Sequence, residues 1–267
     1  MPSLISGPDS TVFGFPGRKE GNDGRNPDPW TGRTGQRSCS LSSGDGRLLR
    51  RAVFPGLPEL RGRKAGTDRV LWRLELGQPH RAELLVLSGM RPSWEHLVEQ
   101  AGWPGAEDPQ AVVRSYQPLL ERLSVGQQYA FRVRANPVSS TRHPLAPSVA
   151  QKERLAAQQR PRGVRVAHRT ARDQLVWFTD RIESWGFSLL LTSSGDSQLQ
   201  LSGRDRLSFT KSASDGERRR VTIQTAVFEG TLQVTEPTTA RNTLLNGIGS
   251  GRAYGCGLVT LSPLYTS

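Results

Sequence analysis

Cysteine is scarce in this 267-residue sequence, which contains only Cys39 and Cys256. The two residues lie far apart and form no C-x-x-C pair, so the sequence predicts neither a disulfide framework nor a zinc site. It also lacks an apolar run of membrane-spanning length, and a basic N-terminal region followed by an apolar stretch. These absences favour a soluble cytoplasmic protein without a membrane partner.

Motifs of common catalytic and metal sites are missing as well. The histidines His80, His96, His143 and His168 form no H-E-x-x-H motif and no pair suited to a metal ion. No G-x-S-x-G elbow occurs, and neither cysteine has a recognisable basic neighbourhood that would activate it. The sequence therefore predicts no metal site and gives little support to a hydrolase triad.

Acidic residues are too few to balance the basic ones, because 24 Asp and Glu stand against 36 Lys and Arg and leave a formal charge of +12. Arginine dominates the basic set, and its guanidinium group forks onto phosphate oxygens and stacks on bases. This balance predicts a polyanionic partner such as nucleic acid. A high-GC genome that favours Arg codons would produce part of the same bias, so charge alone does not decide.

Apolar patterning is absent from residues 1–46, which are crowded with Gly, Pro, Ser and charged residues. We expect this segment to be disordered, or to come from a misassigned start, because it offers no face that could be buried. Patterning begins near residue 48, and an N-terminal domain is expected over residues 47–123 with its first strand missing or degraded. That domain combines a helix at 94–101 with strands at about 70–76, 82–87 and 112–119.

A second domain is expected over residues 124–267. Its clearest strand is 127–135, and its clearest helix is 171–185, where Thr170 and Asp173 are placed as a variant of the capping box. Further strands are expected at about 187–191, 198–209, 220–234 and 258–261, with turns at 214–216 and 229–230 and a helix at about 237–248. Both halves thus approximate the βαββαβ order of the α+β ferredoxin-like fold, the scaffold of the RRM class of RNA binders.

The most informative motif is a glycine-rich segment at residues 247–257, which follows a helix and opens a strand. A phosphate-binding loop of a nucleotide cofactor site has the opposite order and, in a P-loop, a lysine that is missing here. We therefore expect no nucleotide or other small-molecule cofactor. Close packing against an RNA backbone and a tight structural turn both remain open. The residues of interest are Gly247, Gly249, Gly251, Arg252, Gly255 and Gly257.

Two basic tracts occupy residues 152–172 and 204–220. In the second, Lys211, Arg218, Arg219 and Arg220 flank the tip of an expected hairpin. A run of charge is usually a solvated face, and that reading is the better one for any single arginine. Clustering on loops beside a glycine-rich turn favours phosphate binding for the group.

Several stretches together resemble the CasE family of type I-E CRISPR systems. They are Val70-Leu-Trp-Arg-Leu74, Ala101-Gly-Trp-Pro104, Phe131-Arg-Val-Arg-Ala-Asn-Pro137, Ala226-Val-Phe-Glu-Gly230 and Ala253-Tyr-Gly-Cys-Gly-Leu258. They occur in the order that the family shows, over about residues 52–264, and an ordered set is more specific than any one motif.

The resemblance implies two tandem ferredoxin-like domains of the RAMP superfamily and an endoribonuclease that processes CRISPR RNA. Its implied partners are the CRISPR repeat RNA stem-loop and the other subunits of the Cascade complex. It further implies metal-independent cleavage at the 3′ base of the stem and retention of the product. With the glycine-rich segment, the hairpin arginines and Lys211 are the expected RNA-binding residues.

The sequence departs from the family at its expected catalytic histidine, which lies on the first helix of the N-terminal domain, shortly before a Phe-Pro pair. Counting back from Phe54-Pro55 puts Arg47 near that position, and no histidine precedes His80. The catalytic residue is therefore unknown from the sequence. The alternative is a non-catalytic subunit that binds the stem-loop without cleaving it.

Overall fold

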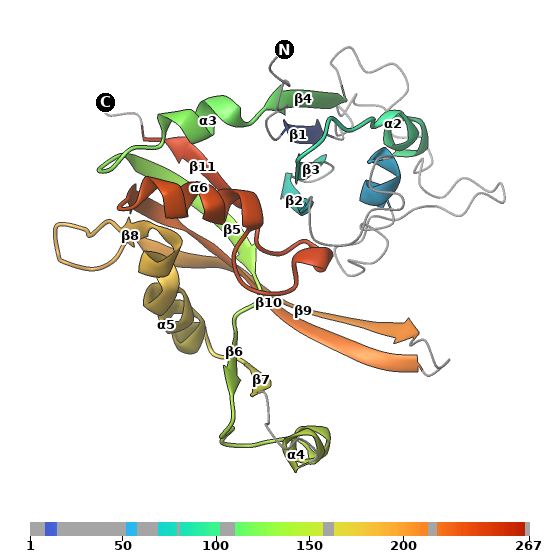
Figure 1. Ribbon diagram of the computed structural model, residues 1–267, viewed down its shortest axis with the longest axis vertical. Coiled ribbons are helices and arrows are strands. Elements are labelled where there is room, and N and C mark those ends of the chain that lie inside the picture. Colours follow the sequence, from blue (N-terminus) through green and yellow to red (C-terminus); the bar gives the residue numbers. More distant parts are fainter. Residues whose placement is uncertain are drawn as a thin grey trace, which may run out of the picture. The chain divides into compact units, whose positions relative to one another are not determined.

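The chain divides into two compact units between Glu121 and Arg122, and the three residues Ala253–Gly255 near the C-terminus group with the first unit. A computed structural model describes residues 9–14, 52–57, 69–78, 81–101, 110–156, 163–212 and 218–264. Each unit has a main antiparallel sheet with helices beside it, and the second unit has a further two-stranded sheet (Figure 1). Among these residues, no helix is both long and apolar enough to cross a membrane.

The first unit contains a four-stranded sheet with the strand order β2-β3-β1-β4. Its elements are β1 (Asp9–Gly14), η1 (Phe54–Gly56), β2 (Leu71–Gln78), β3 (Arg81–Ser88), α2 (Glu95–Ala101) and β4 (Ala111–Ser115), followed by α3 (Gln117–Arg122) at the division. A helical segment follows β1 and another follows β3, so the order is βαββαβ. Trp72, Trp94 and Leu97 are among the buried residues of its core.

Strand β1 corrects the expectation that the first strand is missing and that residues 1–46 are disordered throughout. It pairs antiparallel with β3, from Asp9 opposite Ser88, and with β4, from Asp9 opposite Ser115. The run Thr-Val-Phe at residues 11–13 has high β propensity, although Gly and Pro surround it in the sequence. Six residues suffice because hydrogen bonds form along both edges of the strand. The other residues of 1–46 lie outside the described ranges.

The strand expected at 112–119 is also corrected. Strand β4 ends at Ser115, and α3 begins at Gln117. Pro118 explains the change, because proline lacks the backbone N–H that a strand would use and is tolerated in the first turn of a helix.

The second unit contains a sheet of order β11-β5-β10-β8, with β9 paired to β10. Its strands and helices are β5 (Gln128–Ala135), β6 (Val138–Thr141), α4 (Val149–Ala156), β7 (Val164–Ala167), α5 (Ala171–Ile182), η3 (Glu183–Trp185), β8 (Phe187–Leu189), β9 (Leu199–Ser212), β10 (Arg218–Val234), α6 (Pro237–Asn246), η4 (Arg252–Tyr254) and β11 (Val259–Pro263). The path β5, α5, β8, β10, α6, β11 is again βαββαβ, which confirms the predicted α+β ferredoxin-like fold.

Aromatic stacking joins α5 to the sheet of the second unit. Phe178 of α5 stacks on Phe228 of β10 and Phe131 of β5, with ring centroids 4.7 and 5.4 Å apart. Strand β5 alternates buried and less buried residues, as expected for a strand with one face on the core. The predicted cap of α5 is confirmed, because the Thr170 side chain accepts a 3.0 Å hydrogen bond from the backbone N–H of Asp173.

Two further expectations in this unit are wrong. No turn interrupts residues 229–230, since β10 runs through them, and a Cβ on Gly230 would overlap the Gln198 carbonyl oxygen. Glycine is needed there for a close approach between backbones. The tract at 152–172 is not simply a loop, because it includes most of α4 and all of β7, which pairs with β6 in a separate two-stranded sheet.

Backbone hydrogen bonds join the two ends of the glycine-rich segment to each other and to β5. The Gly257 N–H donates to the Arg134 carbonyl at 2.7 Å, and its own carbonyl accepts from the Ile248 N–H at 3.0 Å. Its φ is +92°, and a Cβ there would lie 2.6 Å from the Ile248 carbonyl oxygen. Gly255, which groups with the first unit, has a φ of +78°, and its Cβ would lie 2.6 Å from the Trp72 ring. These approaches support the tight structural turn.

Replacing Gly257 with alanine is expected to lower the free energy of unfolding by about 1–3 kcal/mol, because positive φ strains a residue that has a side chain and the new Cβ meets a carbonyl oxygen. Chemical denaturation of the full chain, followed by circular dichroism, measures the change. Gly195→Ala is a matched control, with a φ of +87° and nothing within 4 Å of its Cβ. Equal destabilisation of the two variants would show that the close approach at Gly257 is unimportant.

Candidate nucleic-acid interface

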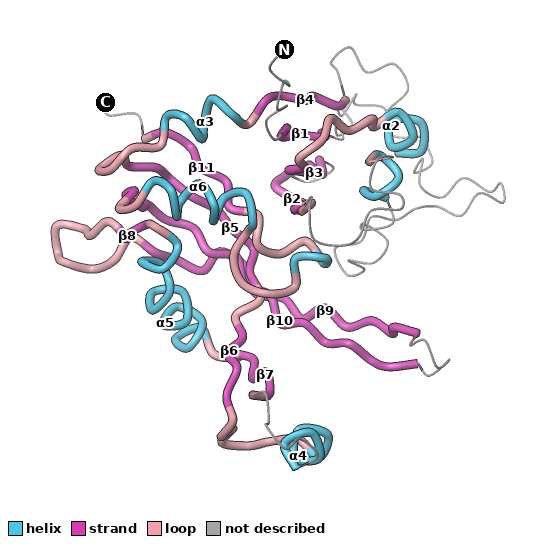
Figure 2. The backbone as a smooth tube through the Cα atoms, viewed as in Figure 1, coloured by secondary structure: helices cyan, strands magenta, loops and turns pink. Residues whose placement is uncertain are grey.

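Part of β10 leaves the sheet as a two-stranded ribbon. Residues 226–233 of β10 pair with β5, whereas residues 218–225 pair with β9 alone, opposite residues 205–212. We call these two segments the basic ribbon, and Figure 2 shows them extending beyond the sheet. A ribbon of this kind presents side chains on two faces and can enter a groove of a nucleic acid.

The basic ribbon gathers the cationic residues that the sequence singled out. In its register Arg218 lies opposite Ser212, Arg219 opposite Lys211, and Arg220 opposite Thr210. The exposed Arg220 side chain donates a 2.8 Å hydrogen bond from Nε to Ser208 Oγ, a neutral acceptor, so its charge is not cancelled there. The expected turn at 214–216 lies outside the described residues.

An ion pair stands at the base of the basic ribbon. Arg134 of β5 lies 3.1 Å from the carboxylate of Asp205 and donates to Thr225 Oγ1 at 3.2 Å. Arg134 is part of the motif at residues 131–137, and here it ties β5 to both ribbon strands. Its charge is therefore used to hold the ribbon base in place.

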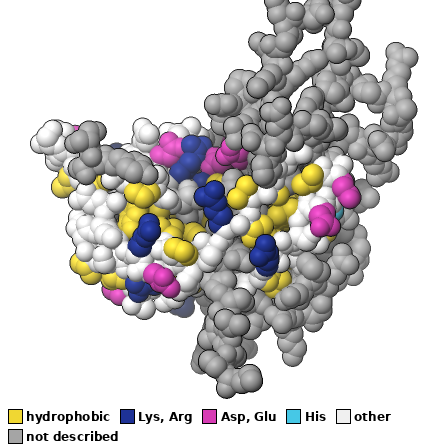
Figure 3. All heavy atoms as spheres, turned by 90° about the horizontal axis from the view of Figure 1, so that it is seen from above, with side chains coloured by type: hydrophobic (Ala, Val, Ile, Leu, Met, Phe, Trp, Pro, Cys, Tyr) yellow, Lys and Arg dark blue, Asp and Glu magenta, His cyan; other side chains and the backbone are white. Residues whose placement is uncertain are grey.

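Figure 3 shows a face on which the described Lys and Arg side chains lie apart from one another, among hydrophobic side chains and some Asp and Glu. Scattered charges of this kind are solvated separately and make a weak polyanion site. The basic ribbon differs from this face in its backbone register, which brings the positions of Lys211, Arg218, Arg219 and Arg220 together at one end of a hairpin.

Acid–base and nucleophilic groups are mostly committed to structural roles. His96 Nε2 lies 2.9 Å from the Ala52 carbonyl, and His168 Nε2 lies 2.7 Å from Ser139 Oγ. Burial raises the pKa of Cys256 to about 12, although the positive charge of Arg134 acts in the opposite direction, so the thiol stays protonated at neutral pH. His143 is exposed, and His80 and Arg47 lie outside the described residues. Within those ranges, no group of three or more His, Cys, Asp or Glu side chains is placed to hold a metal ion.

The glycine-rich segment contributes to a pocket that the sequence did not predict. Gly249, Ser250 and Arg252 line it together with residues of β6, β7 and α5. Ser250 Oγ accepts a 3.0 Å hydrogen bond from the Asn136 side chain, and Arg252 donates to the Gly247 carbonyl at 2.9 Å. Of the six residues expected in this segment, Gly249 and Arg252 thus line a cavity, while Gly257 closes the turn.

The other pocket residues come from distant parts of the sequence. In the sequence, Arg165 is one charge among several in the tract at 152–172, and Trp185 is the last residue of the helix expected at 171–185. Ser139 and Arg181 gave no local signal at all. A pattern search finds neighbours along one element, whereas this pocket depends on the β6–β7 pairing and on the end of α5.

Comparison with known proteins supplies the family. The chain matches the family described as "CRISPR associated protein" over residues 38–263. It is 31% identical over 220 residues to the CRISPR-associated endoribonuclease Cse3 of Thermus thermophilus, covering 81% of this chain and 88% of that relative. A solved structure of Cse3 bound to a 19-nucleotide RNA is similar at 25% identity and a TM-score of 0.62, covering 96% and 99% of the two chains.

A second solved structure agrees with this result in fold. It is Thermus thermophilus Cse3 bound to an RNA representing a pre-cleavage complex, with 24% identity, a TM-score of 0.62, and coverage of 96% of this chain and 100% of that chain. The resemblance found in the sequence motifs is therefore confirmed over most of the chain. This chain belongs to the CRISPR-associated protein family that contains the endoribonuclease Cse3 (CasE).

Proposed function

We propose that this protein matures CRISPR RNA. It binds the stem-loop of the repeat in the precursor transcript, cuts the RNA at the 3′ base of the stem, and stays bound to the product with the other Cascade subunits. The observation that carries the proposal is the 31% identity to Cse3 over 220 residues, a range that includes most of both units. The basic ribbon supports it, because its clustered cations suit the phosphates of an RNA duplex.

The proposed contacts divide between two surfaces. The basic ribbon provides Lys211, Arg218, Arg219 and Arg220 to duplex phosphates. The glycine-rich segment provides a rigid turn from which Arg252 projects. Contacts to phosphate position the RNA, and they carry little sequence information by themselves.

The proposed reaction uses the ribose 2′-hydroxyl at the cut site as the nucleophile. This oxygen attacks the adjacent phosphorus, the bond to the 5′ oxygen of the next nucleotide breaks, and the products carry a 2′,3′-cyclic phosphate and a 5′-hydroxyl. The protein must align the three reacting atoms, move a proton from the attacking oxygen to the leaving one, and stabilise negative charge on the phosphate. Guanidinium groups can do the last of these without a metal ion.

The second candidate function is binding without cleavage, and one observation favours it. No histidine precedes His80, and Arg47 stands near the position of the expected proton-transfer residue. An arginine keeps its proton at neutral pH, so it can stabilise phosphate charge but is a poor base for a hydroxyl. The two candidate functions therefore differ in the rate at which the bound RNA is cleaved.

Binding is expected to depend on salt through the basic ribbon. Changing Arg218, Arg219 and Arg220 together to glutamine should weaken stem-loop binding and reduce the slope of log K against log salt concentration. On a duplex, the reduction should be about 0.9 for each phosphate that the protein no longer neutralises. Titrations at several salt concentrations by fluorescence anisotropy measure this slope.

A control for this experiment changes Arg91 and Arg122, two exposed arginines outside both basic tracts, to glutamine. The reduction in slope per removed charge should be clearly smaller in the control. A slope that is unchanged in the ribbon variant would remove the ribbon from the interface while leaving the family unaffected.

Cleavage is expected to be slow. Loss of a general acid or base typically lowers the rate by about 10² to 10⁴, so the chain should cut far more slowly than Arg47→His, or than a chimera whose first 52 residues are a family-like strand and histidine-bearing helix. Single-turnover assays in EDTA with end-labelled repeat RNA measure the three rates.

Product analysis completes this test, because a 2′,3′-cyclic phosphate identifies attack by the 2′-hydroxyl. Equal rates from all three proteins, with this cyclic product, would show that another residue performs the proton transfer. Tight stem-loop binding with no product from the natural chain would favour the non-catalytic function.

A further inference from the structure

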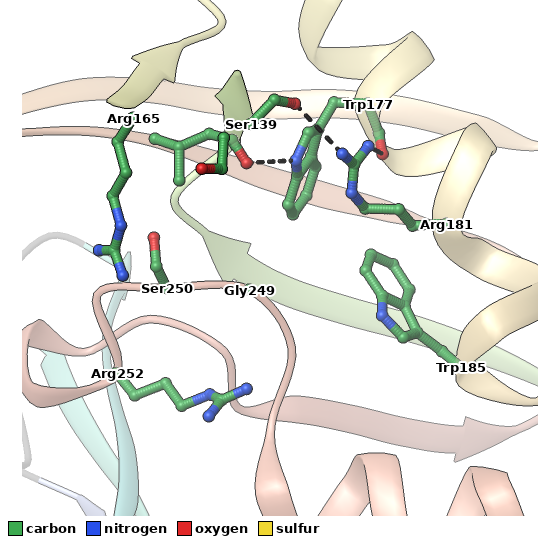
Figure 4. Close-up of a pocket in the computed structure, with 10 residues that line it drawn as sticks. Ser139, Arg165, Trp177, Arg181, Trp185, Gly249, Ser250 and Arg252 are labelled. Atoms are coloured by element: carbon green, nitrogen blue, oxygen red, sulfur yellow. Dashed lines mark hydrogen bonds between the residues drawn. The ribbon is translucent and has the colours of Figure 1, made fainter. Parts of the chain in front are cut away.

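The pocket beside the glycine-rich segment is an open surface pocket with a volume of about 350 Å³. This volume falls within the range of about 300–1,000 Å³ that small-ligand sites occupy. Serine, arginine and tryptophan side chains dominate its lining, and no Asp or Glu is among the described residues that line it. The residues used below are Ser139, Arg165, Trp177, Arg181, Trp185 and Arg252 (Figure 4).

One wall of the pocket is held in place by Arg181. Its guanidinium donates to the Trp177 carbonyl at 2.9 Å and to Ser139 Oγ at 3.1 Å, and it lies 5.2 Å from the centroid of the Trp177 ring. Ser139 Oγ also lies 2.7 Å from His168 Nε2. Both acceptors of the Arg181 hydrogen bonds are neutral, so they leave its positive charge uncompensated beside the cavity.

Arg165 and Arg252 bring two further guanidinium groups to the lining of the pocket. Arg165 of β7 is exposed and makes no side-chain hydrogen bond or ion pair with another residue of the described ranges. Arg252 reaches in from the glycine-rich segment while it donates to the Gly247 carbonyl at 2.9 Å. Figure 4 shows Arg165 beside Ser250, with Trp185 across the pocket from them. The lining of the pocket therefore combines cationic guanidinium groups with aromatic rings.

Trp185 contributes an indole ring that packs against two other aromatic rings. Trp185 is half-buried, with its ring centroid 5.2 Å from Phe178 and 5.8 Å from Trp177. Trp177 itself is almost fully buried, and its Nε1–H donates to the Val138 carbonyl at 3.0 Å. Trp185 is thus the ring that remains available to a ligand. Because neighbouring rings already hold it in place, it loses little conformational entropy when a ligand binds.

We propose that this pocket binds one unpaired nucleotide of the RNA, next to the stem-loop, with its base on Trp185 and its phosphate held by Arg165 and Arg252. Single-stranded RNA is recognised by stacking on aromatic rings and guanidinium planes, and by hydrogen bonds to hydroxyl groups such as those of Ser139 and Ser250. The proposal rests on the proposed function, since it assumes that the stem-loop is the substrate. It adds a contact outside the duplex.

An acidic peptide is the competing occupant, because three guanidinium groups would also attract carboxylates. The exposed part of Trp185 favours the nucleotide, since an acidic peptide has no flat ring that must stack. The serine hydroxyls favour it as well, because a ribose and a base edge need both donors and acceptors.

The test compares a minimal repeat stem-loop with the same stem-loop extended by several unpaired nucleotides on its 5′ side or on its 3′ side. A 2′-deoxy nucleotide at the cut site keeps all three RNAs intact during equilibrium titrations. We expect one extension to tighten binding by about tenfold, and Arg165→Ala and Trp185→Ala each to remove most of that gain. Neither variant should change the affinity for the minimal stem-loop. Arg165→Ala should also reduce the salt slope for the extended RNA by about 0.7, the value for one phosphate on a single strand.

Two controls keep the result interpretable. Arg122→Ala removes an exposed charge of the same unit outside the pocket and should leave the gain intact. Trp185→Phe keeps a ring for stacking and should retain part of the gain, which separates stacking from any loss of folding in Trp185→Ala. Thermal unfolding of each variant is measured in parallel.

The proposal is overturned if neither extension tightens binding by the natural chain, or if the gain survives in both Arg165→Ala and Trp185→Ala. It is also overturned if polyglutamate abolishes the gain at a concentration that leaves stem-loop binding unchanged, because the pocket would then prefer an acidic peptide. Failure of the natural chain to bind the minimal stem-loop is a different result, and it overturns the proposed function itself.

Discussion

The pairing of β10 with three other strands is the constraint on which the second unit depends. Its 17 residues pair with β5 and β8 inside the sheet and continue along β9 in the basic ribbon. Phe228 on this strand stacks on Phe178 of α5, so one strand carries both the core packing and the candidate interface. Only a bulge between Val227 and Phe228 interrupts its register with β9. The direction of the ribbon is therefore set by the sheet and needs no hinge.

Much of this architecture can be predicted from the sequence, because the strongest elements carry their signals locally. Strand β5 has a clean alternation, and α5 has an apolar stripe with Thr170 as its cap. Strand β1 could not be predicted in the same way, since its short Thr-Val-Phe run acquires two neighbours only through long-range pairing. The turn expected at Gly230 was wrong because glycine is also used inside a strand where another backbone approaches closely. That approach, by the Gln198 carbonyl, is visible only in the folded structure.

The candidate site also has one part that the local sequence predicts and one part that depends on long-range contacts. Lys211 and the arginines at 218–220 are neighbours in a hairpin, so their grouping follows from sequence and register. The pocket residues Ser139, Arg165 and Trp185 come from β6, β7 and the end of α5, and their grouping requires the tertiary fold. Charge counts could not find them, because the pocket is distinguished by the absence of a carboxylate from its described lining and by a fixed ring.

The neutral partners of Arg181 have a consequence for how an anion would reach this side chain. The guanidinium is held by a carbonyl and a hydroxyl rather than by a carboxylate. An anion that enters the pocket therefore displaces no negatively charged partner of Arg181 from the described residues. Dissolved salt weakens such an attraction, because mobile ions screen the charge.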